Sequence, residues 1–160
     1  MDRKDAMRVV AMLKAAYPAS KWGEDDELTF DVWQMALHDV PAQYVIQTLP
    51  GLMRTSIFAP SPAEVLSAVF AASGVGPEPE VAWGHVQSWL RKHTEYSALP
   101  APIKAAINDI GGTYNLRNSE RPGNDRKAFM DAYAVRRNEA ITSPDFSAMI
   151  GAGFMALGAG

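Results

Sequence analysis

The chain has 160 residues, no cysteine and a formal net charge of −3 at pH 7. The lack of cysteine excludes a disulfide framework, thiolate metal sites and cysteine nucleophiles, and it fits a reducing cytosol. A hydrophobic share of 48% is enough to form a core, and no apolar run reaches the roughly 18 residues that span a membrane.

The first two helices are marked by capping residues and by apolar side chains at helical spacing. The first is predicted from Asp2 to Tyr17, because Pro18 stops it. The second is predicted to begin at a cap on Thr29, and the acidic run 24–27 supplies negative charge at its N-terminus. A metal site in that run is disfavoured, because adjacent carboxylates on one turn do not converge and no histidine accompanies them.

Two further helices complete the predicted N-terminal domain. The third is expected after Pro41, and 50–51 (Pro-Gly) is expected to break or kink it. The fourth begins at 61–64 (Ser-Pro-Ala-Glu), where Ser61 caps the helix and the glutamate completes a capping box. These four helices are predicted to form one domain over residues 1–72.

A Gly- and Pro-rich linker is predicted at 73–79. In the helix that follows, Trp83 and Trp89 recur at the spacing of a buried face. The alternative is that these tryptophans stack on single-stranded bases beside Arg91 and Lys92. The spacing favours a core position.

The C-terminal domain is predicted over residues 80–140 as three helices. The second of them runs from Pro100 to Ile110 and is ended by Gly111. The polar stretch 115–123 is predicted to be a turn, and 125–140 the last helix. The expected fold class is therefore all-α.

The tail, 141–160, is apolar and rich in glycine, and 143–145 (Ser-Pro-Asp) is a helix start signal. Glycine costs roughly 1 kcal/mol per helical position relative to alanine, so this helix is expected to be marginal alone. Two interpretations stay open. The tail becomes ordered on a partner, or it packs on its own domain.

No catalytic, cofactor-binding or metal-binding motif is found in the sequence. The histidines (His38, His85 and His93) have no nucleophile motif beside them, and neither a phosphate-binding loop nor a dinucleotide fingerprint is present. The sequence predicts that the protein is not an enzyme and acts by binding.

The order of several motifs resembles a known family. The segments 12–18 (MLKAAYP), 32–41 (VWQMALHDVP) and 58–64 (FAPSPAE) make residues 2–72 similar to the N-terminal domain of phage helicase loaders and inhibitors. The back half is similar to the second part of many such phage replication proteins. Its motifs are Ala82-Trp83, a Pro100–Gly112 helix ending in Gly-Gly, and Arg126 with Phe129 and Tyr133.

This resemblance implies a cytoplasmic accessory factor of phage DNA replication that has no cofactor. Such a protein binds a hexameric DnaB-type replicative helicase, restrains it and delivers it to an origin-bound replication protein. A pliable C-terminal part is implied to contact the helicase. The corresponding residues here are Arg136, Arg137, Ile141, Phe146, Met149, Ile150, Phe154 and Met155.

Two other functions stay open. The back half is mildly basic, which is compatible with a DNA-binding initiator or regulator. Its candidate nucleic-acid contacts are Arg91, Lys92, Arg121, Arg126 and Lys127. The third reading is a structural phage protein, such as a tail-assembly factor.

Overall fold

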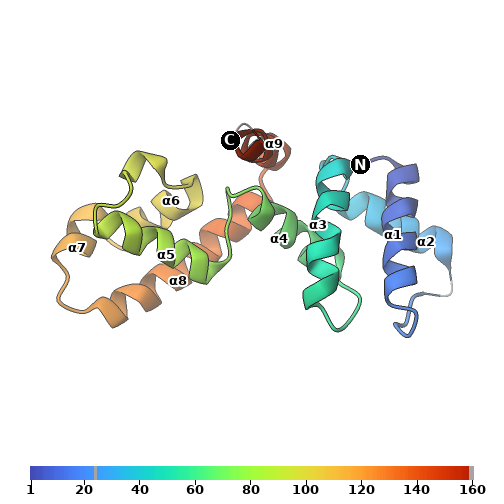
Figure 1. The fold of residues 1–160 in the computed structure, drawn as a ribbon, viewed down its shortest axis with the longest axis horizontal. Helices are drawn as coiled ribbons and strands as arrows, with labels where there is room; N and C mark the ends of the chain where they lie inside the picture. The colour runs from blue at the N-terminus through green and yellow to red at the C-terminus, as the bar shows by residue number, and fades with distance from the viewer. Residues whose placement is uncertain (24, 159–160) are drawn as a thin grey trace. The chain divides into compact units, whose positions relative to one another are not determined.

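The computed structural model describes residues 1–23 and 25–158, and these contain nine α-helices, one 3-10 helix and no strand (Figure 1). The prediction of an all-α fold is confirmed. The chain divides into two compact units, Met1–Val69 and Phe70–Gly160. The helices are α1 (Arg3–Ala16), α2 (Asp26–Ala36), α3 (Ala42–Thr55), α4 (Pro62–Ala72), α5 (Pro79–Leu90), η1 (Tyr96–Ala98), α6 (Ala101–Asp109), α7 (Gly112–Asn118), α8 (Pro122–Ile141) and α9 (Phe146–Gly158).

In the first unit, α1 packs against α2 and α3. One apolar face of each helix is turned inward, as helical spacing of apolar residues requires. The core consists of fully or almost fully buried side chains: Ala6, Val9, Val10, Leu13, Trp33, Leu37, Val40, Val45, Leu49, Val65 and Val69.

The caps of α1 and α2 are both aspartates. The Asp2 carboxylate accepts a hydrogen bond from the Asp5 amide over 2.8 Å, as predicted. The predicted cap on Thr29 is wrong. The cap of α2 is Asp25, whose carboxylate accepts from the Leu28 amide over 3.1 Å. Because Asp25 satisfies that donor, α2 begins four residues earlier, and Thr29 instead donates its hydroxyl to the Asp25 carbonyl oxygen. Glu24 lies outside the described residues.

The start of α4 is a reciprocal cap, as predicted. The Glu64 carboxylate accepts from the Ser61 amide over 2.7 Å, and the Ser61 hydroxyl accepts from the Glu64 amide over 3.3 Å. The bond from the Ser61 amide holds the pKa of Glu64 below its usual range. A predicted break at Pro50 is wrong, because α3 continues through it to Thr55.

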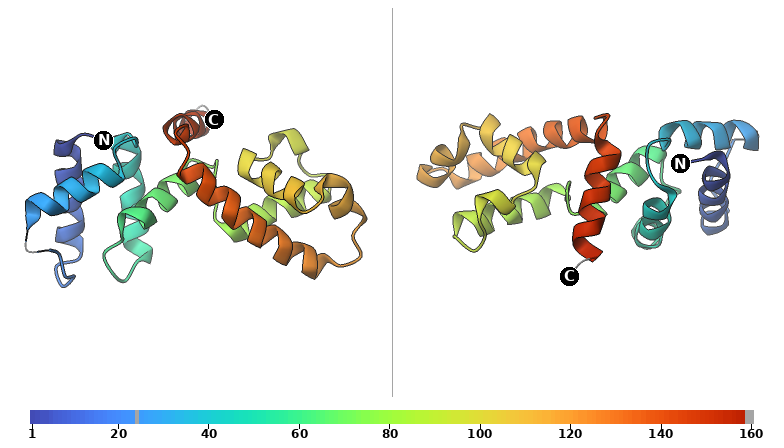
Figure 2. Two further views of the ribbon diagram at one scale, coloured as in Figure 1. Left: turned by 180° about the vertical axis from the view of Figure 1, so that it is seen from behind. Right: turned by 90° about the horizontal axis from the view of Figure 1, so that it is seen from above.

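In the second unit, the 20-residue helix α8 packs along α5 and α6 (Figure 2). Aromatic rings join these helices: Trp83 lies 5.4 Å from Phe129 between ring centroids, and Phe129 lies 5.5 Å from Tyr133. Trp83 and Trp89 are both buried, so the core position predicted for them is confirmed. The remaining core side chains are Ala82, Val86, Leu99, Ile103, Ala106, Ile107 and Leu116.

The helix α7 was not predicted, because residues 115–123 resemble a turn. Gly111 has a φ of 99° after the last turn of α6, the left-handed position in which glycine commonly ends a helix. The chain then starts α7 at once, and Leu116 anchors that short helix in the core. Burial of one leucine outweighs the turn-forming character of its neighbours.

Candidate partner-binding surfaces

The helix α2 has two apolar faces. Trp33 and Leu37 are buried in the core, whereas Leu28, Val32 and Met35 are exposed by 61%, 49% and 74%. Positions 28, 32 and 35 share one side of a helix that has about 3.6 residues per turn, and this side lies opposite Trp33 and Leu37. We call the three exposed residues the outer face of α2. Three exposed large apolar side chains in one row are typical of a contact surface.

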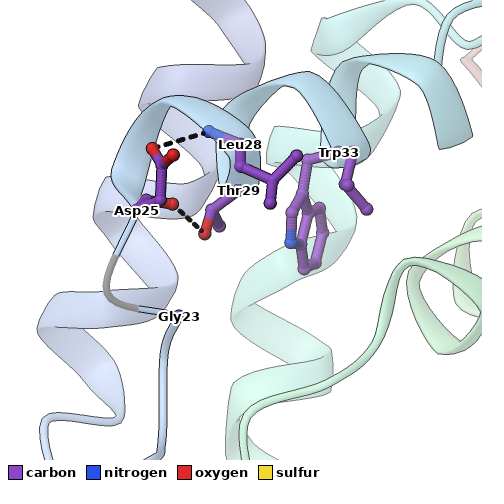
Figure 3. A pocket seen from close by; sticks show the side chains of 6 residues that line it. Gly23, Asp25, Leu28, Thr29 and Trp33 are labelled. Atoms are coloured by element: carbon purple, nitrogen blue, oxygen red, sulfur yellow. Dashed lines mark hydrogen bonds between the residues drawn. The ribbon is translucent and has the colours of Figure 1, made fainter.

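A hollow of about 470 Å³ adjoins the outer face. Its lining includes Leu28, Val32, Thr29 and Trp33, and Asp25 lies at its rim (Figure 3). The buried indole thus provides an apolar wall beside the exposed row. An apolar side chain of a partner would fit between them.

Carboxylates surround this surface. Asp25 caps α2, whose own acidic residues are Asp26, Glu27 and Asp31, and the helix contains no basic residue. Arg3 of α1 pairs with Glu27 and, over 3.0 Å, with Asp31, and Lys14 pairs with Asp26. Four carboxylates therefore face two cations, and the surroundings of the outer face stay negative.

The predicted partner-binding residues of the tail lie on or before α9, and the structure buries two of them. Phe146 and Ile150 are fully buried, and the Phe146 ring meets the edge of Phe70 at 5.3 Å between centroids. Helix α9 approaches the backbone at Ser73 so closely that only a glycine fits at Gly153. The exposed apolar side chains of α9 are Met155 and Leu157, while Ile141, Met149 and Phe154 are partly exposed.

The two arginines predicted to bind a partner both form contacts within the second unit. Arg136 makes a two-pronged ion pair with Asp109, with both nitrogen–oxygen distances at 2.6 Å, and a further pair with Glu139. This contact lowers the pKa of the Asp109 carboxyl. Arg137 is buried, donates to the carbonyl oxygen of Gly76 over 3.1 Å and pairs with Glu78.

The predicted nucleic-acid contacts are not equivalent. Arg126 pairs with Glu80 over 2.5 Å, whereas Arg91, Lys92, Arg121 and Lys127 form no ion pair with any residue that the structure describes.

Lys92 lines a smaller hollow of about 220 Å³ together with Trp89, Tyr96 and Arg117. The guanidinium of Arg117 lies over the Trp89 ring, 4.9 Å from its centroid. The buried indole N–H of Trp89 has no hydrogen-bond acceptor among the described residues. This group of cations and rings was only partly predicted, because Arg117 is far from Trp89 in the sequence.

Within residues 1–23 and 25–158, no cluster of three or more His, Asp or Glu side chains could hold a metal ion. No helix in the same ranges has the length and hydropathy needed to cross a bilayer.

Residues 1–66 match the family model for the N-terminal domain of phage helicase loaders and inhibitors. The first part of the chain is a helicase-loader N-terminal domain. The family predicted from the sequence motifs is thereby confirmed over this range. Neither a curated protein nor a solved structure matches the chain.

Within this helicase-loader N-terminal domain, the outer face of α2 was not predicted from the sequence. Leu28, Val32 and Met35 stand at helical spacing, which was a usable signal. It was overlooked because Thr29 was taken as the helix cap, which placed Leu28 outside the helix. The shift of that cap to Asp25 brings all three residues onto one helical row.

Proposed function

We propose that this protein is an accessory factor of phage DNA replication that binds a hexameric DnaB-type replicative helicase in the host cytoplasm. It restrains the helicase and delivers it to an origin-bound replication protein. The match of residues 1–66 to the helicase-loader N-terminal domain is the observation that carries this proposal. The protein acts by binding, without catalysis of its own.

Exposed apolar side chains support a binding role. Leu28, Val32 and Met35 form a row on the first unit, and Met155 and Leu157 are exposed on α9. Removal of such side chains from water is the main favourable term in protein association. The predicted role of the tail in helicase contact is therefore assigned to the exposed side chains of α9.

The purified full-length protein and the hexameric helicase of its host test the proposal by sedimentation velocity, with and without ATP. We expect a complex heavier than the hexamer and a decrease in ATP turnover as the protein is added. A helicase that sediments and hydrolyses ATP unchanged at saturating protein would refute the proposal.

Replacement of exposed residues tests the tail better than its deletion. Loss of residues 141–160 would also uncover the Phe70 ring that Phe146 covers, so a truncated chain could lose binding through misfolding. Met155→Ser with Leu157→Ser leaves Phe146 and Ile150 in place. We expect weaker helicase binding from this double variant with an unchanged circular dichroism spectrum.

A direct DNA-binding function is the second candidate, and one observation favours it. Lys92 has no ion-pair partner among the described residues, and it shares a hollow with Trp89, Tyr96 and Arg117. Cations beside aromatic rings are the usual means of holding a single strand. Fluorescence anisotropy of labelled single-stranded DNA would show salt-dependent binding that Lys92→Gln with Arg117→Gln abolishes. Arg136 and Arg137 are unsuitable targets because both form structural contacts.

A further inference from the structure

We infer that the outer face of α2 is a second docking surface, and that it receives an amphipathic helix bearing lysine or arginine beside its apolar row. The inference rests on the proposed function in one respect, namely that the helix belongs to the replicative helicase. Its chemistry is derived from Leu28, Val32 and Met35, the hollow beside them and the surrounding carboxylates.

The form of the occupant follows from the geometry of the apolar row. Residues 28, 32 and 35 follow the i, i+4, i+7 spacing of a helix that contributes one side of a helix pair. The hollow between Leu28, Val32 and Trp33 lies along one side of that row. A second helix laid beside α2 covers the row and places one apolar side chain in the hollow, which is the helix-in-groove mode of recognition.

The sign of the occupant's charge follows from the carboxylates. Glu27 and Asp31 share the single cation Arg3, and Asp25 stands at the rim of the hollow. An incoming lysine or arginine would complete these pairs. A second copy of the chain brings its own carboxylates against the same surface, so pairing of two α2 helices is opposed by like charges. Nucleic acid and anionic lipid headgroups are repelled for the same reason.

The contact is measured by titration of the full-length protein into the helicase, with calorimetry at low and moderate salt. Leu28→Ser, Val32→Ser and Met35→Ser are combined in one variant. All three side chains are exposed, so the fold is retained, and circular dichroism checks this. We expect affinity to fall about tenfold or more, as the loss of a buried apolar cluster at an interface requires.

The matched control is Ile57→Ser with Phe58→Ser, which removes two exposed apolar side chains from the same unit without touching α2. We expect this control to bind the helicase like the wild type. The variant Glu27→Gln with Asp31→Asn tests the charge argument. It should bind more weakly at low salt and lose part of the salt dependence of the wild type.

A photo-reactive residue in place of Met35 identifies the occupant, and the same residue in place of Ile57 is the control. We expect a cross-link from position 35 to a helical segment of the helicase that carries lysine or arginine. If the wild type binds the helicase and the triple variant binds equally well, the docking surface is refuted while the proposed function stands. A cross-link to an acidic segment, to a second copy or to lipid refutes the assigned occupant. If the wild type itself shows no helicase binding, the proposed function fails first.

Discussion

The phenol of Tyr133 in α8 donates a hydrogen bond to the carbonyl oxygen of Pro77 over 2.7 Å, and this contact is buried. One turn further along α8, Arg137 donates to the carbonyl oxygen of Gly76. Both acceptors lie in the segment 73–79, which by composition was predicted to be a linker. Two backbone carbonyls of this segment thus receive their hydrogen bonds from one helix, as buried carbonyl groups require.

Replacement of Tyr133 by phenylalanine should destabilise the second unit. The variant keeps the ring beside Phe129 but leaves the Pro77 carbonyl oxygen buried without a donor, which costs about 1–3 kcal/mol. Urea unfolding followed by tryptophan fluorescence measures the change, and Tyr114→Phe is the control because Tyr114 is exposed. Equal stability of the two variants would mean that the Pro77 contact contributes nothing.

The same tyrosine should make stability depend on alkaline pH. Burial raises the pKa of Tyr133 above its ordinary value of about 10. The folded chain therefore holds this proton at a pH where the unfolded chain has lost it. The stabilisation is fully present below about pH 10 and declines as the pH rises further. Unfolding free energies at pH 8 and pH 10.5 should differ more for the wild type than for Tyr133→Phe.

Adjacent arginines should differ in their importance for stability. Arg137→Ala removes a donor from the buried Gly76 carbonyl oxygen, so we expect a loss of about 1–3 kcal/mol. Arg136→Ala breaks pairs with Asp109 and Glu139 at the surface, where such pairs contribute about 0–1 kcal/mol. Chemical denaturation of both single variants provides the comparison, with each serving as the other's control. A larger loss for Arg136→Ala would contradict this account.

Local signals predicted local structure well. The caps at Asp2 and Ser61 follow from residues within one helical turn of each other, so the sequence was sufficient to place them. The cap of α2 was misplaced because four acidic residues precede Thr29 and any of them can cap a helix. The correct choice depends on which carboxylate reaches a free amide, and Asp25 does.

The packing of α9 could not be predicted, because the residues that hold it are distant in the sequence. Phe146 covers Phe70, and Gly153 lies against Ser73 and Val75. A glycine-rich apolar helix has no polar stripe to orient it, so its pattern alone does not identify which face is buried. Both interpretations of the tail were therefore equally compatible with the sequence, and the structure has the tail packed on its own unit.

The close approach of α9 to the chain at Ser73 leads to a prediction with an internal control. An alanine Cβ at Gly153 would overlap the Ser73 carbonyl oxygen and lie 2.7 Å from Val75 Cγ2, and backbone there cannot yield cheaply. Gly153→Ala should therefore displace α9, although alanine favours a helix by about 1 kcal/mol over glycine. Gly158→Ala makes the same chemical change where a Cβ meets nothing within 4 Å. In hydrogen–deuterium exchange, the amides of α9 should exchange faster in Gly153→Ala and no faster than the wild type in Gly158→Ala. Equal protection in both variants would mean that α9 is not held at Ser73, because the clash that distinguishes the two positions would then be absent in solution.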